Sequence, residues 1–417
     1  MAAAALDNIK EGEEYGAWVV SADSALPERL KGTPAAQGLL PHIPIGVKDI
    51  YNTTEFPTQM GSALWKDFTP GNDARAVYNL KRQGALVVGK TVTAEFAVHA
   101  LDKTLNPYDK TKTPGTSSSG SAVAVALGMV PAATGTQTAG SIIRPASFCG
   151  VYACKPSFGT IPRTGMLKTT DSLDSLGFFT VFGEDLRRMF DSMKISGLNY
   201  PISHAAFSDK ARQSKPAGRP WKVAFVRTHT WQSAPEYAKQ AIQTFAERLS
   251  KEPGFEVFEP ELPASMAATH ETHATIYDKS LSYYFQHEYS HDEKISLVMK
   301  SMIEKGKKIS PEAFASALEH QSGMIRDMDA FMSGLDAIIC LSTSGEAPPR
   351  DVVELPDPAL MWTLTHLPVI SAPVFLSPGN LPFGLQLVAR KYNDYLLFDL
   401  LALLKERGLV PAKGSFF

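Results

Sequence analysis

Short apolar runs alternate along the chain with segments whose apolar positions recur at helical spacing. Residues 85–90, A-L-V-V-G-K, form a mainly apolar run that is typical of a buried strand. The preceding residues 73–83 place Ala76, Val77 and Leu80 on one helical face. Strands that alternate with amphipathic helices indicate an α/β fold. We therefore predict a large mixed, mostly parallel twisted β-sheet enclosed by α-helices.

The same pattern continues through most of the chain. Residues 44–50, P-I-G-V-K-D-I, predict a buried strand that leads into a loop, and residues 91–97 predict a turn and a helix. Residues 121–129 carry small side chains on every side, which predicts a helix packed in the interior, and residues 130–134 predict a strand. Later strands are expected at 221–226, 255–258, 335–341, 368–375 and 383–389, and later helices at 237–249 and 395–406.

A single domain over residues 1–417 is the expected organisation, because large α/β enzymes often form one unit around one sheet. Residues 205–221 are polar, basic and rich in Pro and Gly, which is typical of an exposed connection. The domain is expected to comprise an N-terminal helical segment (1–40), a core (41–190), that connection, a helical insert or pocket cap (264–333) and a C-terminal sheet portion (334–406).

Composition narrows the class of protein. Hydrophobic residues make up 44% of the chain and charged residues 20%, as in ordinary globular proteins. The net charge of −2 gives no electrostatic basis for binding nucleic acid or an anionic membrane. The three cysteines are too few for a disulfide framework and are expected to be buried thiols. With no signal peptide or membrane span apparent, the expected location is cytoplasmic.

Two turns rich in serine and glycine carry the candidate chemistry. Residues 113–121 read T-P-G-T-S-S-S-G-S, and residues 135–141 read G-T-Q-T-A-G-S. Either turn alone is more simply explained as a flexible linker or a helix cap. Joined by one tightly packed helix and strand, they can hold two hydroxyls and several free N–H groups around one point. Acyl transfer needs these parts: a nucleophile, a proton relay and an oxyanion hole.

Lys48 is the candidate base. It lies between the apolar I-P-I-G-V and D-I, which suggests burial at a strand end, although most lysines are solvated charges. Burial lowers the pKa of a lysine, and a neutral amine can accept a proton from a serine.

These motifs, in this order, resemble the amidase signature family. P-I-G-V-K-D, P-G-T-S-S-S-G-S-A-V-A-V-A and G-T-Q-T-A-G-S-I-I-R-P-A-S-F-C-G carry the resemblance. It extends to S-L-D-S-L-G-F-F and, toward the C-terminus, to L-P-V-I-S-A-P and L-P-F-G-L-Q-L-V-A-R. The resemblance to the family is strong over residues 40–190 and moderate over residues 335–405. Residues 41–190 would then be the signature core of an amidase domain.

The resemblance implies a serine–serine–lysine triad. Ser141 corresponds to the nucleophile, Ser117 to the bridging serine and Lys48 to the base. It also implies a cis peptide between Thr116 and Ser117. The N–H groups that correspond to the oxyanion hole belong to Thr138, Ala139, Gly140 and Ser141. The implied activity is hydrolysis of a small-molecule amide through an acyl-enzyme, with no cofactor and no metal.

Departures from the family pattern concern specificity. Gln137 replaces an acid, and Arg144 is displaced from the usual position of an arginine. Arg144 is expected either to form a structural ion pair with Asp174 or to bind a substrate carboxylate. Met60 is a candidate for the pocket wall, with plain core packing as the alternative. Phe178, Phe179 and several tyrosines favour an apolar or aromatic acyl group, whereas Arg144 favours a carboxylated one, and the sequence leaves both open.

Three other functions compete with amide hydrolysis. The resemblance permits an amidotransferase component that supplies ammonia to a partner, and family members are often homodimers. Residues 287–291, H-E-Y-S-H, fit the zinc peptidase motif H-E-x-x-H, with His270 and His273 nearby, but the motif arises readily by chance. A catalytically silent binding protein is disfavoured because Lys48, Ser117 and Ser141 are all present.

Overall fold

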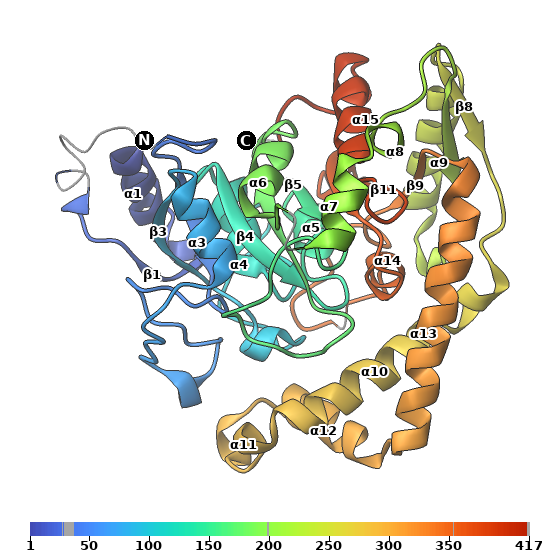
Figure 1. The fold of residues 1–417 in the computed structure, drawn as a ribbon. Helices are drawn as coiled ribbons and strands as arrows, with labels where there is room; N and C mark the ends of the chain where they lie inside the picture. Colours follow the sequence, from blue (N-terminus) through green and yellow to red (C-terminus); the bar gives the residue numbers. More distant parts are fainter. Residues whose placement is uncertain (27, 29–36, 198–199, 353, 415–417) are drawn as a thin grey trace.

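A single large sheet organises the molecule. The computed structural model describes residues 1–26, 28, 37–197, 200–352 and 354–414 (Figure 1). In this part of the chain eleven strands form one sheet in the order β1-β3-β2-β4-β6-β5-β10-β11-β9-β7-β8. The strands are β1 (Trp18–Ser21), β2 (Pro44–Lys48), β3 (Leu86–Thr91), β4 (Ala132–Gln137), β5 (Tyr152–Lys155), β6 (Ser175–Thr180), β7 (Trp221–Phe225), β8 (Phe255–Phe258), β9 (Ala337–Leu341), β10 (Val369–Leu376) and β11 (Pro382–Val388).

The sheet is mixed, as expected, but the prediction that it is mostly parallel is wrong. Parallel pairing joins β2 to β3 and β4, and β7 to β8 and β9. The other six neighbouring pairs are antiparallel. For example, only residues 377–381 connect β10 to β11, and a connection that short joins antiparallel strands rather than crossing over to a parallel one.

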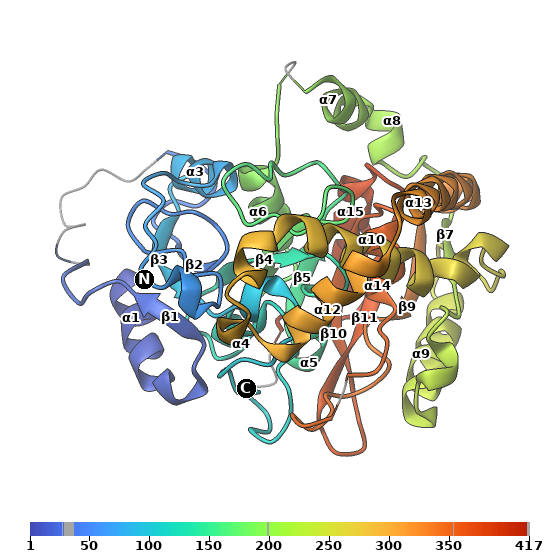
Figure 2. The same ribbon diagram turned by 90° about the horizontal axis from the view of Figure 1, so that it is seen from below.

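Helices cover both faces of the sheet. In Figure 2, α3 and α6 lie on one side of the strands, and α4 and α5 lie on the other. The helices of the described residues are α1 (Ala2–Glu11), α3 (Arg75–Arg82), α4 (Ser119–Ala126), α5 (Ile143–Phe148), α6 (Asp185–Met193), α7 (Pro201–Ser208), α8 (Lys210–Gln213), α9 (Glu236–Ser250), α10 (Thr269–Tyr284), α11 (Gln286–Tyr289), α12 (Leu297–Lys308), α13 (Pro311–Phe331), α14 (Ala359–Leu364) and α15 (Asp394–Glu406).

The predicted elements of the core lie close to their expected positions. Helix α4 is buried on every side, because its Ser, Gly, Ala and Val side chains let it pack tightly against the strands. All three cysteines are buried and free. The helix expected within residues 91–97 is only a 3₁₀ turn at Glu95–Ala97. A strand, β1, was missed in the segment 1–40, where residues 27 and 29–36 lie outside the described residues.

Residues 264–333 are largely helical, in line with expectation. They form an arm, coloured yellow to orange, that projects from the sheet in Figure 1. Seen from below in Figure 2, α10 and α12 lie across the middle of the molecule. The connection expected at 205–221 contains the end of α7 and all of α8 before β7 begins. The arm positions α10 over the turn that follows β4, where the candidate nucleophile lies.

Candidate active site

Lys48 occupies the last position of β2, a strand in which every residue is buried. The strand is flanked by β3 and β4, so the lysine side chain is enclosed. Its amine is directed at three hydroxyl oxygens, those of Ser117 (2.8 Å), Ser118 (2.9 Å) and Thr136 (2.9 Å). Burial holds the pKa of Lys48 well below its usual range, and nearby carboxylates only partly oppose this shift. The neutral amine is therefore favoured, as a general base requires.

Ser117 lies in the turn that leads into α4. The peptide bond between Thr116 and Ser117 is cis, as the resemblance implied. The Ser117 carbonyl accepts a hydrogen bond from the Ala94 amide at 3.0 Å, which anchors the turn on the segment after β3. The turn thus presents the Ser117 hydroxyl to the Lys48 amine.

Ser141 lies between β4 and α5, and its side chain is buried except for a small exposed fraction. Segments on both sides of it pack against the turn that carries Ser117. Before Ser141, the Thr136 carbonyl accepts a hydrogen bond from the Ser118 hydroxyl at 3.3 Å. After it, Arg144 Nη1 donates to the Thr116 carbonyl at 3.3 Å. The fold therefore brings the two serine-bearing turns together.

In the loop of residues 138–141, three carbonyls are occupied, and three amides have no partner among the described residues. Each of three consecutive carbonyl oxygens accepts a hydrogen bond from a different part of the fold. The pairs are Thr138 with His273 Nε2 (2.8 Å), Ala139 with Thr363 Oγ1 (2.7 Å) and Gly140 with the Arg144 amide (2.8 Å). Among the described residues, no acceptor pairs with the amides of Ala139, Gly140 and Ser141. These N–H groups are available to stabilise an oxyanion, as three of the predicted positions require.

Gln137 stabilises this loop through its side-chain hydrogen bonds. Its side-chain carbonyl accepts hydrogen bonds from the amides of Ile142 and Ile143, both at 2.9 Å, at the start of α5. Its amide group donates to Thr363 Oγ1 at 2.9 Å, and that hydroxyl donates onward to the Ala139 carbonyl. Gln137, which departs from the family pattern, thus caps the start of α5 and also donates a hydrogen bond to Thr363.

Glycine is required at position 140. A Cβ atom there would come within 2.2 Å of Asp357 Oδ2, far below any normal contact. The close approach of Asp357 also fixes Arg144, whose Nε donates to Asp357 Oδ2 at 2.7 Å. The loop is consequently held on one side by an ion pair and on the other by α10 through His273.

A cavity of about 570 Å³ lies beside the loop, a size suited to a small molecule. Thr116 and Ala139, which neighbour the two serines in the chain, form part of its wall. The remaining wall comes from α10, α12, the start of α14, the segment around His99, and individual residues: Thr113, Arg144, Arg350, Val352 and 354–357. The arm of helices therefore contributes directly to the candidate substrate cavity.

Arg144 lines this cavity but does not pair with Asp174 as expected. It pairs with Asp357 (2.5 Å) and Glu354 (2.8 Å), two residues that carry no local signal of such a role. Asp174 instead accepts hydrogen bonds from the Thr138 and Thr169 hydroxyls. Arg144 does form a structural ion pair, as expected, but Asp174 is not its partner. The actual partners lie more than 200 positions away in the chain, so no local sequence pattern indicates them.

Met60 lies in the hydrophobic core, 8% exposed, and is not among the residues that line the cavity. Its backbone bridges two segments, donating to the Asp49 carbonyl and accepting from the Phe96 amide. Phe178 and Phe179 are fully buried in β6 and likewise do not line the cavity. A direct contact of Met60 with substrate stays a prediction.

The H-E-x-x-H segment begins within α11 and extends two residues beyond it. Glu288 is buried and accepts a hydrogen bond from Trp65 Nε1 at 3.1 Å, while the rings of His287 and His291 lie 5.0 Å apart. In the described part of the chain no group of three or more His, Cys, Asp or Glu side chains is arranged to hold a metal ion. His270 and His273 both line the cavity instead, and His270 also faces His229, with 2.7 Å between their Nε2 atoms.

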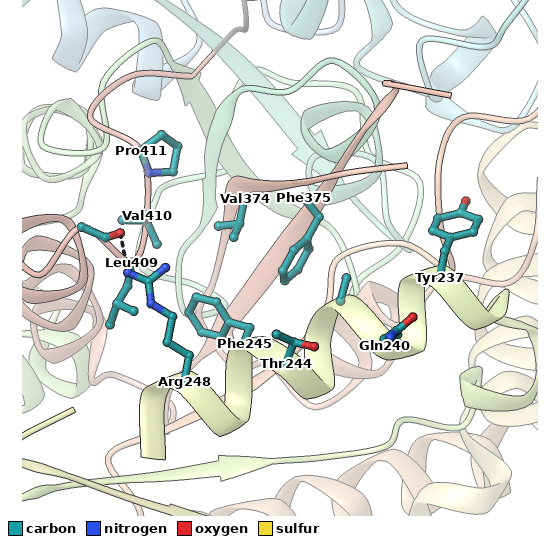
Figure 3. Close-up of a pocket in the computed structure, with 12 residues that line it drawn as sticks. Tyr237, Gln240, Thr244, Phe245, Arg248, Val374, Phe375, Leu409, Val410 and Pro411 are labelled. Atoms are coloured by element: carbon teal, nitrogen blue, oxygen red, sulfur yellow. Dashed lines mark hydrogen bonds between the residues drawn. The ribbon is translucent and has the colours of Figure 1, made fainter. Parts of the chain in front are cut away.

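A second cavity, of about 610 Å³, lies away from this site (Figure 3). It is formed by α9, the end of β10 and the segment 408–411. Arg248 closes one side by donating to the Gly408 carbonyl at 3.2 Å. Lys48, Ser117 and Ser141 line neither cavity, but Thr116 and Ala139, which lie within two residues of the serines in the chain, line the first one. We therefore assign the candidate chemistry to the cavity beside Ala139.

The chain matches the family model described as Amidase over residues 4–398, and it therefore belongs to the amidase family. Among curated proteins it is similar to a glutamyl-tRNA(Gln) amidotransferase subunit of Staphylococcus epidermidis. The two are 28% identical over 89% of this chain and 84% of that protein.

Solved structures share the fold. A native peptide amidase from Stenotrophomonas maltophilia superposes with a TM-score of 0.80 and 22% identity, covering all of this chain and 95% of the other. A 6-aminohexanoate cyclic dimer hydrolase bound to its substrate superposes with a TM-score of 0.84 and 19% identity, covering 98% of this chain and 93% of the other. Within the described residues, no helix combines the length and apolar character that crossing a bilayer requires.

Proposed function

We propose that this chain hydrolyses the C–N bond of a small carboxamide through a covalent acyl-enzyme on Ser141. The observation that carries the proposal is the hydrogen bond between the buried Lys48 amine and the Ser117 hydroxyl, beside the loop that holds Ser141. A buried amine aimed at a hydroxyl is the arrangement that activates a serine without a histidine. Membership of the amidase family supports the same reaction.

The reaction proceeds in two halves. Lys48 accepts a proton from Ser117, Ser117 accepts one from Ser141, and the Ser141 oxygen bonds to the amide carbon. The amides of residues 139–141 hold the oxyanion until the C–N bond breaks, and the relay returns a proton to the departing nitrogen. Water then attacks the ester on Ser141 by the reverse relay, which releases the carboxylic acid and restores the hydroxyl.

The proposal is tested by ammonia release from simple primary amides. We expect the purified chain to form ammonia and acid in equal amounts, and Ser141→Ala to abolish the reaction. An exposed serine, Ser322, provides a matched control, since Ser322→Ala alters only the surface of α13. Equal turnover by Ser141→Ala would contradict the assignment of the nucleophile.

A second candidate is the ammonia-supplying component of an amidotransferase. The similarity to the Staphylococcus epidermidis amidotransferase protein over 89% of the chain favours it. Such a component would pass ammonia to a partner, so glutamine would be its substrate and its activity would depend on that partner. Ammonia release from apolar amides by the isolated chain, with glutamine unreactive, would select the hydrolase instead.

Assembly and location are also proposals. The chain is proposed to act in the cytoplasm on a small molecule, with a homodimer as the assembly to be tested. Three free buried cysteines are consistent with a reducing compartment. Light scattering of the purified chain measures the oligomeric state directly.

A further inference from the structure

We infer that the cavity beside Ala139 binds an uncharged apolar part of the substrate and disfavours a carboxylate. This inference rests on the proposed amidase function and names the class of amide that the site accepts. It assigns Arg144 to the structure of the cavity rather than to substrate binding.

Exposed apolar side chains gather at this cavity. Leu101, Val298, Val352 and Leu355 are each between 39% and 52% exposed, and all four line it. They come from three separate parts of the chain: the segment after β3, helix α12 and the loop before α14. Large exposed apolar residues that converge on one opening indicate a surface that a ligand covers.

Four further residues of the wall are apolar or aromatic. They are Ala274 and Tyr277 of α10, Met302 of α12 and Leu360 of α14. Tyr277 is nearly fully buried, and burial raises the pKa of its hydroxyl, so the phenol stays neutral. An alkyl chain or ring extending from the oxyanion loop to the opening would contact apolar groups along its course.

The arginines of the wall are already occupied. Arg144 uses Nε and Nη2 on Asp357 and Nη1 on Glu354. Arg350 donates from Nη2 to the Asp102 carbonyl at 2.6 Å and from Nη1 to the Thr104 carbonyl. A substrate carboxylate near Arg144 would therefore meet two carboxylates before it reached a free donor.

The other ionisable groups add no net attraction for an anion. Burial lowers the pKa of His99 to about 3 and that of His273 to about 4, so both are neutral at pH 7. Lys305 is exposed, and its charge acts on Asp278 across the cavity wall. His270 also lines the cavity, and burial lowers its pKa as well. The two arginines and Lys305 are thus matched by three acids: Asp278, Glu354 and Asp357.

The test compares kcat/KM for four amides: acetamide, octanamide, N-hexylacetamide and the monoamide of octanedioic acid. We expect octanamide or N-hexylacetamide to exceed acetamide by at least about tenfold, since apolar burial contributes in proportion to chain length. A higher kcat/KM for octanamide would show that the acyl side of the substrate occupies the cavity. A higher kcat/KM for N-hexylacetamide would show that the amine side does. The carboxylated monoamide is expected to be at least about tenfold poorer than octanamide.

Two variants localise the effect. Val298→Ser and Leu355→Ser are expected to lower kcat/KM much more for the long amide than for acetamide. Leu297→Ser is the matched control, because Leu297 is 84% exposed on the same helix and does not line the cavity. Glu354→Gln removes one acid beside Arg144 and should raise the relative turnover of the carboxylated monoamide.

Binding to Ser141→Ala separates this inference from the catalytic proposal. Calorimetry should show tighter binding of octanamide than of acetamide even if no amide is turned over. Equal binding and turnover of short and long amides would overturn the apolar subsite while leaving amide hydrolysis intact. Preference for the carboxylated monoamide would overturn it as well.

Discussion

The Lys48 amine and the Ser117 hydroxyl are joined by a 2.8 Å hydrogen bond although they lie 69 positions apart in the chain. The parallel pairing of β2 with β3 places Lys48 beside the carboxyl end of β3, and the Ala94 amide just after β3 donates to the Ser117 carbonyl at 3.0 Å. Lys48 ends β2, and β4 leads into the loop that holds Ser141. Base, relay and nucleophile thus arise from the packing of neighbouring segments around one edge.

Removal of the Lys48 base should strongly reduce the rate of catalysis. We expect Lys48→Ala to lower kcat by a factor of about 10³, since general acid–base catalysis contributes factors of that order. Ser119→Ala is the control in the same turn, because its hydroxyl donates to Asp102 rather than contacting Lys48. Steady-state kinetics on a primary amide measures both, and comparable losses in the two variants would argue against Lys48 as the base.

The pH dependence of kcat/KM should report Lys48. Burial lowers its pKa, so the amine loses its proton below the usual lysine range, and only the neutral form accepts a proton from Ser117. Activity is therefore expected to rise with pH and to level off once Lys48 is neutral, at a midpoint below 10.5. A profile measured from pH 5 to pH 10 checks this. A rate that falls over the same range would be incompatible with a lysine base.

Stability should change with pH for the same reason. In the window between the lowered folded pKa of Lys48 and its unfolded value near 10.5, the unfolded chain binds one more proton at this position. The free energy of unfolding therefore increases with pH through that window. Lys48→Met lacks this contribution, so the stability of wild type relative to the variant, measured by urea unfolding, should increase as the pH rises toward 10.5. A difference that is independent of pH would count against a lowered pKa.

Gln137 should act through the oxyanion loop. Gln137→Glu can still accept from the Ile142 and Ile143 amides but cannot donate to Thr363. The Thr363 hydroxyl would then turn toward the new carboxylate and release the Ala139 carbonyl. We expect kcat to fall about fivefold with KM little changed, since a buried hydrogen bond contributes about 1 kcal/mol.

Two further variants check this link. Thr363→Val should mimic Gln137→Glu, because it removes the hydroxyl that ties Gln137 to Ala139. Thr365→Val is the matched control, since Thr365 is equally buried but donates to the Met361 carbonyl within its own turn. Full activity in Thr363→Val would show that the loop keeps its geometry without the link.

Much of the core could be predicted from sequence, since local patterns specify it. The apolar run at β3, the small residues of α4 and the amphipathic face of α3 each determine an element without reference to the rest of the fold. Strand pairing depends on distant segments, so the antiparallel centre of the sheet was not predicted. The partners Asp357 and Thr363 were missed for the same reason, because neither carries a local signal.

The role of the His-rich segment could not be predicted from sequence. His273 was noticed only as a possible zinc ligand, yet it donates to the Thr138 carbonyl of the oxyanion loop. A histidine on a helix gives no indication in sequence of which distant backbone group it will reach. Its position above the loop follows from how α10 crosses the molecule, which only the fold determines.

The most direct test of the central claim is identification of the acylated residue. The enzyme is incubated with an activated ester of octanoic acid, quenched in acid and mapped by peptide mass spectrometry. The account predicts an octanoyl group on Ser141, its formation slowed in Lys48→Ala and Ser117→Ala and absent in Ser141→Ala. An acyl group on any other residue, or undiminished acylation of Ser141→Ala, would contradict it.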